Sequence, residues 1–299
     1  MDTRQRSTYF RRRLQAWFSR HRRALPWRAT RDPYRILVSE IMLQQTQVDR
    51  VMPKYRKFLR QFPTLRSLAR ASRADVVKAW SGLGYNRRAL ALHAAAQRMV
   101  ADNAGNVPQS VEQLEALPGI GPYTARAILT FAFRRRVVAL DTNQLRVYQR
   151  FFFGMKRASM VSIARRASSA LPSRRSDLWN HALMDFGALV CRSRPRCALC
   201  PLRNKCAAYP AILEMSENAH ARKGKPFLGS NRYLRGRILE HIRTLPASKE
   251  QTLFTLQKTF SNIPGGSTVR ARTIIRQLER EGFLLLHGSG RREKVRLRE

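Results

Sequence analysis

The chain has 299 residues, of which 43% are hydrophobic and 9% aromatic, a composition typical of a globular protein with about two domains. Lysine and arginine number 58 against 19 aspartates and glutamates, which gives a formal net charge of +39 at pH 7. Because this charge is spread along the whole chain, it predicts a folded nucleic-acid-binding protein with a polyanionic partner. No apolar run reaches the ~18 residues of a membrane span, so we expect a soluble protein without membrane contact.

The N-terminal segment is rich in arginine and lacks the apolar core of a secretory signal. A transit peptide is one interpretation of such a segment. We favour a basic first helix that carries Leu14, Trp17 and Phe18 on its apolar side. We therefore expect a cytoplasmic protein, associated with the nucleoid if the source is bacterial.

The hydrophobic pattern of the next part of the chain is helical nearly throughout, and proline and glycine separate the segments. Convincing alternation of period two is almost absent before residue 280, so we predict an all-α body. The expected helices are Arg35–Gln44, Val51–Phe62, Thr64–Ala71, Ala74–Trp80, Arg87–Val100, Val111–Leu117, Pro122–Phe133, Asn143–Phe152, Val161–Ala170 and Leu178–Val190.

A glycine-rich hairpin with the sequence LPGIG separates two of these helices at Leu117–Gly121. Gly119 and Gly121 can adopt positive φ, and Pro122 suits the first position of the following helix. The unpartnered N–H groups at that helix start predict a site for an anion such as a DNA phosphate. On this motif alone, an ordinary helix–turn–helix connection is the alternative.

Four cysteines lie within sixteen residues, which is too dense for unrelated buried thiols and indicates one metal site in a reducing compartment. Their spacing is compatible with either a tetrahedral zinc ion or a [4Fe–4S] cluster. The loop Arg192–Arg196 would place positive charge beside the site, either solvated or in contact with phosphate. The four ligands are Cys191, Cys197, Cys200 and Cys206.

The composition changes after a polar, basic stretch at Ala219–Ser230, which we interpret as a linker. The pattern beyond it is that of a winged helix, whose third helix usually enters the DNA major groove. A small helical docking domain with a solvated basic face is the alternative. The expected elements are helices at Arg232–Leu245, Lys249–Phe260 and Thr268–Glu281 and strands at Phe283–His287 and Lys294–Arg298.

Several motifs together resemble the helix-hairpin-helix (HhH-GPD) DNA glycosylases with an iron–sulfur cluster, most of all the adenine DNA glycosylases of the MutY type. The similarity covers about residues 10–210, although the first two cysteines are separated by five residues where the family usually has six. The motifs are, in order, Trp27-Arg28, Ser39–Val48 (SEIMLQQTQV), Gly82–Tyr85, Leu117–Ala125, Asp141 and the four cysteines.

The resemblance implies a two-lobed helical glycosylase fold whose cysteines hold a [4Fe–4S] cluster. Residues 26–133 would form a six-helix domain with the hairpin, and residues 1–25 and 134–213 an iron–sulfur cluster domain. Residues 214–230 would be the linker and residues 231–299 the winged-helix-like domain. This last part is too short and too helical for the NUDIX-like domain that the family usually carries.

Hydrolysis of an N-glycosidic bond requires a leaving base and a stabilised oxocarbenium-like sugar. Glu40 lies in an apolar segment where desolvation would raise its pKa, and the resemblance implies that it protonates adenine at N7. Asp141 can N-cap a helix, and by resemblance it stabilises the oxocarbenium ion while Asn143 orients the groups around it. Thr142 replaces the glycine that usually follows this aspartate.

Position 123 separates two reaction types in the family. Relatives that also cut the DNA strand have a lysine here that forms a Schiff base, whereas this chain has Tyr123, which predicts base removal alone. Tyr123 would donate a hydrogen bond to a phosphate or to Asp141. By resemblance, Gln45 and Tyr85 wedge into the duplex while the target nucleotide is extruded, and Arg28 lies near the flipped purine.

The leading hypothesis is a monomeric, monofunctional glycosylase that removes adenine mispaired with 8-oxoguanine or guanine in double-stranded DNA. One alternative is removal of thymine or uracil opposite guanine. Another is a non-catalytic DNA-binding regulator built on a glycosylase scaffold. The joint presence of Glu40, Tyr123 and Asp141 favours the adenine-specific enzyme.

Overall fold

The computed structural model describes residues 3–218, 226–246 and 250–299, so part of the expected linker, residues 219–225, lies outside the described residues. The described structure is predominantly helical, which confirms the all-α prediction. The chain forms two compact units that share helix α2 (Pro33–Leu43). The first unit comprises Met1–Glu40, Pro108–Ala116 and Ile120–Arg222, and the second comprises Ile41–Val107, Leu117–Gly119 and Lys223–Glu299.

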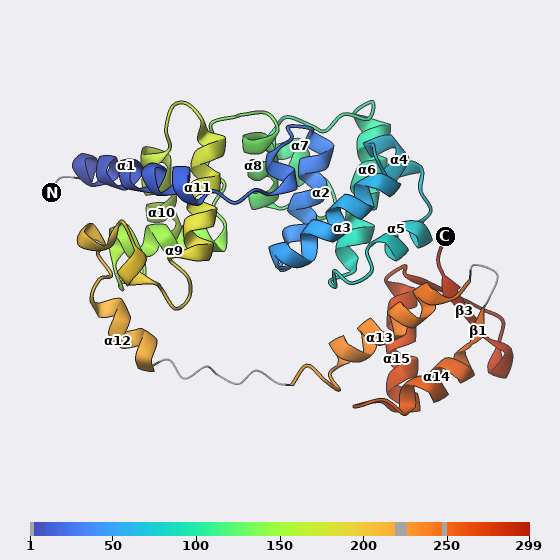
Figure 1. The fold of residues 1–299 in the computed structure, drawn as a ribbon. Helices are drawn as coiled ribbons and strands as arrows, with labels where there is room; N and C mark the ends of the chain where they lie inside the picture. The colour runs from blue at the N-terminus through green and yellow to red at the C-terminus, as the bar shows by residue number, and fades with distance from the viewer. Residues whose placement is uncertain (1–2, 219–225, 247–249) are drawn as a thin grey trace. The chain divides into compact units, whose positions relative to one another are not determined.

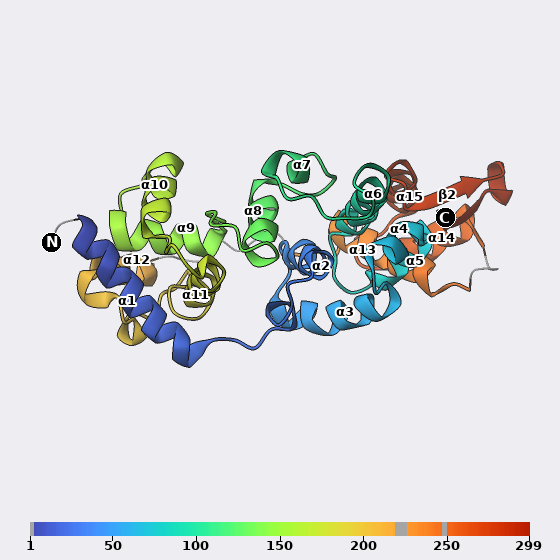
Figure 2. The same ribbon diagram turned by 90° about the horizontal axis from the view of Figure 1, so that it is seen from above.

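The first unit is built around a core of large aromatic side chains. Phe10 of α1 packs edge-on against Trp179 of α11, with ring centroids 5.6 Å apart. Helix α1 contacts α11 and crosses it, as the two views show (Figures 1 and 2), and the apolar side of this basic helix lies on the core. The helices of this unit beside α2 are α1 (Thr3–His21), α7 (Val111–Glu115), α8 (Pro122–Phe131), α9 (Thr142–Tyr148), α10 (Met160–Ala170), α11 (Ser176–Leu189) and α12 (Ala211–Asn218).

The second unit contains the helices of the expected six-helix domain and the C-terminal elements. Ala74 and Val77 of α5 belong to the same buried cluster as the C-terminal helices, so these elements pack on α5. Figure 1 draws the C-terminal elements in orange to red. The unit includes α3 (Val48–Gln61), α4 (Leu65–Arg70), α5 (Arg73–Ala79), α6 (Arg87–Asp102), α13 (Asn231–Thr244), α14 (Leu253–Ser261) and α15 (Thr268–Arg280).

The strands of the C-terminal part form a small antiparallel sheet with the order β1-β3-β2. Strands β2 (Leu284–His287) and β3 (Lys294–Leu297) correspond to the two expected strands, and Leu286 faces Val295 in their register. The sequence did not predict β1 (Gln251–Thr252), which lies where the expected helix began. Two residues are too few to show an alternating pattern. The assignment to the winged-helix class and the expected domain boundaries stay predictions.

The two glycines of the hairpin, Gly119 and Gly121, have different backbone conformations. Gly119 has φ +78°, as expected, and a Cβ placed on it would lie 2.8 Å from the Cβ of Ala91. The expectation of a positive φ at Gly121 is wrong, because its φ is −96° and its ψ is −180°. The cause is Pro122, whose ring restricts the preceding residue to an extended backbone.

This difference predicts unequal costs for two alanine substitutions. Gly119→Ala should lower the free energy of unfolding by about 1–2 kcal/mol or more, since a left-handed backbone and a steric clash act together. Gly121→Ala is the matched control, because no atom lies within 4 Å of the place that its Cβ would take. Urea denaturation of both variants checks this; equal stability of the two would contradict it.

Candidate active site

Glu40 is a buried carboxyl group near the end of α2, with only 6% of its surface exposed. Burial raises its pKa to about 7, and the nearby charge of Asp141 acts in the same direction. The Tyr123 hydroxyl donates a hydrogen bond to Glu40 and opposes this rise. Glu40 is therefore protonated in a large fraction of molecules near neutral pH.

Tyr123 lies in the first turn of α8, and its position differs in one respect from the expectation. Its hydroxyl bonds to Glu40 rather than to Asp141. Burial raises the pKa of Tyr123 well above its usual value, and the charges of Glu40 and Asp141 add to this effect. The phenol therefore remains a neutral hydrogen-bond donor, and it contains no amine that could act as a nucleophile.

Asp141 caps α9, as the sequence predicted. Its Oδ1 accepts a hydrogen bond of 2.6 Å from the backbone N–H of Gln144, and its Oδ2 accepts one of 3.0 Å from Nδ2 of Asn143. Burial raises the pKa of Asp141, while these two bonds oppose the rise by stabilising the ionised form. The two carboxyl groups thus differ in surroundings, since Asp141 accepts several hydrogen bonds and Glu40 accepts one from a phenol.

The contacts of Asn143 continue to the cysteine loop through Arg146. Arg146 donates a hydrogen bond of 2.6 Å to Oδ1 of Asn143 and another of 2.7 Å to the carbonyl oxygen of Cys191. Gly187 of α11 allows this arrangement, because a Cβ there would lie 2.6 Å from the Cβ of Asn143. The side chain that orients Asp141 is thereby tied to the first of the four cysteines.

A third carboxyl group, that of Asp185 in α11, was not singled out from the sequence. It forms a bidentate pair with Arg28, at 2.7 and 2.9 Å, and a further bond of 2.6 Å with Nε of Arg23. Burial alone would raise the pKa of Asp185, but the hydrogen bonds and charges of the two arginines outweigh it and lower the pKa. Arg28 is only 4% exposed, so this pair fixes the position of its guanidinium, and its positive charge lowers the pKa of Glu40.

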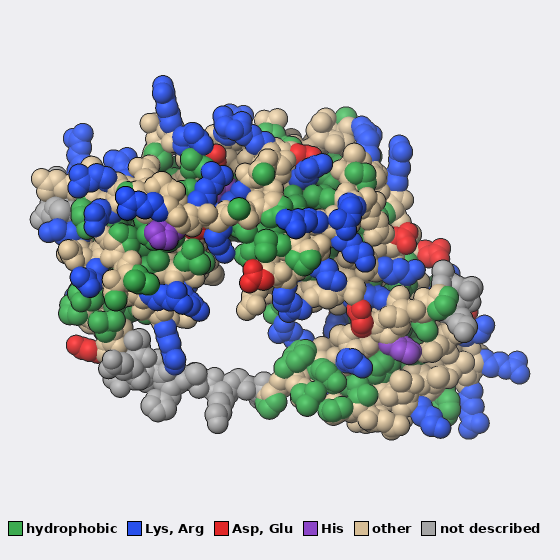
Figure 3. Space-filling view, viewed as in Figure 1, with side chains coloured by type: hydrophobic (Ala, Val, Ile, Leu, Met, Phe, Trp, Pro, Cys, Tyr) green, Lys and Arg blue, Asp and Glu red, His purple; other side chains and the backbone are tan. Residues whose placement is uncertain are grey.

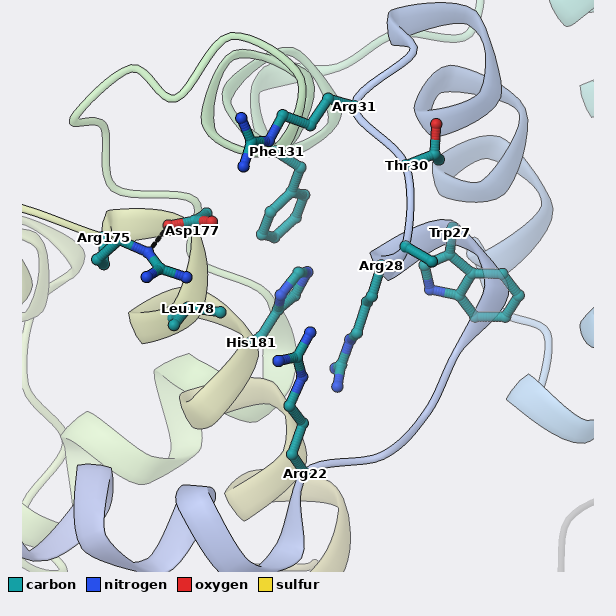
Figure 4. Close-up of a pocket in the computed structure, with 11 residues that line it drawn as sticks. Arg22, Trp27, Arg28, Thr30, Arg31, Phe131, Arg175, Asp177, Leu178 and His181 are labelled. Carbon is teal, nitrogen blue, oxygen red and sulfur yellow. Dashed lines mark ion pairs between the residues drawn. The ribbon is translucent and has the colours of Figure 1, made fainter.

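A cavity of about 340 Å³ is lined by Arg28, by further arginines and by an aromatic pair. The ring of His181 stacks on that of Phe131, with centroids 4.3 Å apart. Figure 4 shows these rings and Arg28 around the cavity. Burial lowers the pKa of His181 to about 3, so this histidine is neutral. The sequence pattern around His181 gave no signal of this position, because it reads as an ordinary helix interior.

The four cysteines surround one small cavity of about 30 Å³, together with Arg150. None of them forms a disulfide. Burial raises the pKa of the Cys200 thiol to about 12, and Arg150 donates a hydrogen bond of 3.6 Å to Sγ of Cys191. Among the described residues, no three histidine, cysteine or acidic side chains are grouped closely enough to hold a single metal ion.

The two expected wedge residues, Gln45 and Tyr85, lie in the second unit and line one cavity of about 730 Å³. Tyr85 is 41% exposed, as expected for a residue that contacts a ligand. Lysine and arginine side chains are spread over the face shown in Figure 3, with few acidic ones between them. Within the described residues, no helix is both long and apolar enough to cross a membrane.

Comparisons with known proteins identify the family of this chain. Residues 38–172 match the model of the HhH-GPD superfamily base excision DNA repair protein. The chain is 43% identical over 236 residues to an adenine DNA glycosylase of Mycobacterium tuberculosis, covering 77% of each chain. It belongs to the adenine DNA glycosylases of the HhH-GPD superfamily. A further adenine DNA glycosylase, from Mycolicibacterium smegmatis, is 39% identical to this chain. The alignment covers 80% of this chain and 82% of that relative.

Solved structures of this superfamily share the fold. A thermostable thymine-DNA glycosylase superposes with a TM-score of 0.65 at 30% identity, covering 69% of this chain and 97% of its own. A trapped endonuclease III–DNA covalent intermediate superposes with a TM-score of 0.62 at 22% identity. The superposition covers 70% of this chain and 97% of the endonuclease chain. These likenesses confirm the helical glycosylase fold that the sequence predicted.

The buried state of Glu40 predicts that this residue destabilises the folded protein at alkaline pH. Its folded pKa of about 7 exceeds the ordinary 4.5, so the folded state holds the proton longer and stability falls as pH rises from 4.5 to 7. Glu40→Gln should therefore raise the free energy of unfolding at pH 8 by about 1–3 kcal/mol, with a much smaller change at pH 5.

Denaturation curves at the two pH values measure this difference. Glu112→Gln is the control, because Glu112 is exposed in the first turn of α7. A gain that is the same at pH 5 and pH 8 would show that folding does not raise the pKa of Glu40.

Proposed function

We propose that this protein hydrolyses the N-glycosidic bond of adenine mispaired with 8-oxoguanine or guanine in double-stranded DNA, leaving an abasic site. The observation that carries the proposal is the pairing of two carboxyl groups in different environments. Glu40 is buried with a pKa near 7, and Asp141 is partly buried and accepts hydrogen bonds. An acid and an anion side by side are what this reaction requires.

In this mechanism Glu40 gives its proton to a ring nitrogen of the extruded adenine. The bond between C1′ and the base then breaks, and its electron pair leaves with the base. Asp141 stabilises the oxocarbenium ion that remains, and water adds to C1′ and releases a proton. Tyr123 orients Glu40 through its hydrogen bond and, having no amine, forms no Schiff base.

The neighbouring groups support the binding of a purine. Arg28 is held by its bidentate pair with Asp185 within electrostatic range of Glu40, so its position is fixed before the base arrives. Such preorganisation lowers the entropic cost of binding. Gly119 and Gly121 of the hairpin would hold the DNA backbone, and the backbone around Gly121 is open because no atom lies within 4 Å of its Cβ position.

The four cysteines would hold a [4Fe–4S] cluster, with one thiolate for each iron. They surround one cavity and none of them forms a disulfide, so all four thiols are available as ligands. When bound, the cluster would fix the loop Cys191–Cys206. Arg146 donates to both the carbonyl oxygen of Cys191 and the side chain of Asn143, so it connects this loop to Asn143.

Single-turnover assays on four duplexes test the proposed reaction. We expect base release from A:8-oxoG and A:G pairs, strand breaks only after alkali, and loss of release by at least about 1000-fold in Asp141→Asn. The rate should fall as pH rises above 7, because the proton on Glu40 is then lost. Release of base from T:G or U:G but from neither adenine pair would overturn the proposal.

The cofactor is tested separately on the purified protein. We expect a brown protein with broad visible absorption and about four irons per chain, and loss of both in Cys200→Ser. Leu199→Ser, at an exposed neighbouring position, is the control that should keep its colour. A colourless protein with one zinc per chain would contradict the iron–sulfur proposal.

A further inference from the structure

The cavity that contains Gln45 and Tyr85 is marked by unusual backbone geometry. Gln45 has φ +54° and Tyr85 has φ +44°, and only five non-glycine residues of the described structure have a positive φ. Such conformations cost energy in residues with a side chain and occur preferentially at functional sites. Two of them line the same cavity of about 730 Å³.

Both strained loops are held by one arginine. Arg88 donates hydrogen bonds to the carbonyl oxygens of Ile41 and Met42 in the last turn of α2, of Gln44 in the loop that follows, and of Gly84 in the other loop. Its guanidinium also lies 5.5 Å from the centroid of the Tyr85 ring. The positions of the two loops are therefore fixed with respect to each other.

The C-terminal part of the chain supplies the remaining wall of this cavity. The guanidinium of Arg232, in the first turn of α13, lies 4.5 Å from the centroid of the Tyr85 ring and 5.7 Å from that of Phe227. Phe227 itself is 60% exposed. Arginine and aromatic faces combined in this way bind unstacked nucleobases.

Direct contacts anchor α13 beside the Tyr85 loop. Arg243 donates a hydrogen bond of 2.8 Å to Asn86, and Ser81 donates one of 2.6 Å to Glu240. The buried cluster that includes Val77 of α5 adds an apolar contact. Arg232 is thus presented to the cavity by an ordered helix rather than by a free tail.

The lining of the cavity favours a nucleotide. Five arginines line it, and no aspartate or glutamate does. Arg235 is paired with Glu281, at 2.5 Å, whereas Arg232 forms no ion pair within the part of the chain that the structure describes. The guanidinium of Arg232 is exposed and lies over the Tyr85 ring, so it is placed to stack on a base, and Gln45 and Gln47 offer amides for the edge of that base.

We infer that the C-terminal domain completes, through Arg232, a site for the unpaired nucleotide opposite the excised adenine. This inference rests on the proposed function. Extrusion of adenine toward Glu40 leaves its partner base without a pair, and that base needs a stacking surface. Tyr85 and Arg232 present such a surface, so a helix outside the glycosylase motifs of the sequence takes part in recognition of the opposite base.

The test measures binding by full-length protein that carries Asp141→Asn, so that no base is released. Fluorescence anisotropy gives the Kd for duplexes with adenine opposite 8-oxoguanine, guanine or a reduced abasic residue. Arg232→Gln should weaken binding about tenfold when a base is present, because one stacked base is lost. It should change binding less than about twofold opposite the abasic residue.

Arg237→Gln is the matched control, because Arg237 is exposed on the same helix and does not line the cavity. It should affect all three duplexes equally or not at all. An equal loss on all three with Arg232→Gln would assign Arg232 to the DNA backbone, and no loss on any would remove it from the interface; either result overturns the inference.

These outcomes are separable from failure of the proposed function. If wild-type protein releases no adenine in the single-turnover assay, the proposed function fails, whatever the binding data show. If adenine is released but the effect of Arg232→Gln does not depend on the opposite base, only the role of the C-terminal domain fails. Unchanged thermal unfolding of Arg232→Gln would confirm that its effect is local, as expected for an exposed side chain.

Discussion

The burial of one carboxyl group, Glu40, is the constraint on which the proposed chemistry depends. A glutamate exposed to water would be ionised at neutral pH and useless as an acid, whereas burial in α2 raises its pKa to about 7. Tyr123 limits this rise by donating a hydrogen bond, and Asp141 adds to it. The burial of Glu40 therefore lowers the stability of the folded protein, but it allows protonated Glu40 and ionised Asp141 to coexist in one site.

The rest of the first unit keeps these groups in place. Asp141 caps α9, and its second oxygen is oriented by Asn143, which Arg146 connects to the backbone of Cys191. Close approach of α9 and α11 at Gly187 makes this connection short. A cofactor that fixes the cysteine loop would therefore also fix the carboxylate, without taking part in the reaction itself.

Much of the helical fold and most of the candidate site could be predicted from the sequence, because helical periodicity and motif order are local signals. The pairing of Asp185 with Arg23 and Arg28 could not be predicted, since Asp185 is more than 150 residues away from each arginine along the chain. The partner of Tyr123 and the two-residue strand β1 were missed for the same reason, because tertiary packing decides both. The extended backbone at Gly121 was predictable from the proline that follows it.

Glu40 is largely protonated near neutral pH, and a direct titration of its carboxyl group tests this state. The carboxyl carbon of Glu40 can be observed by 13C NMR in glutamate-labelled protein and assigned by its absence in Glu40→Gln. We predict a titration midpoint near 7 and a higher midpoint in Tyr123→Phe, since the tyrosine bond lowers the pKa. A midpoint near the ordinary 4.5 would contradict the account.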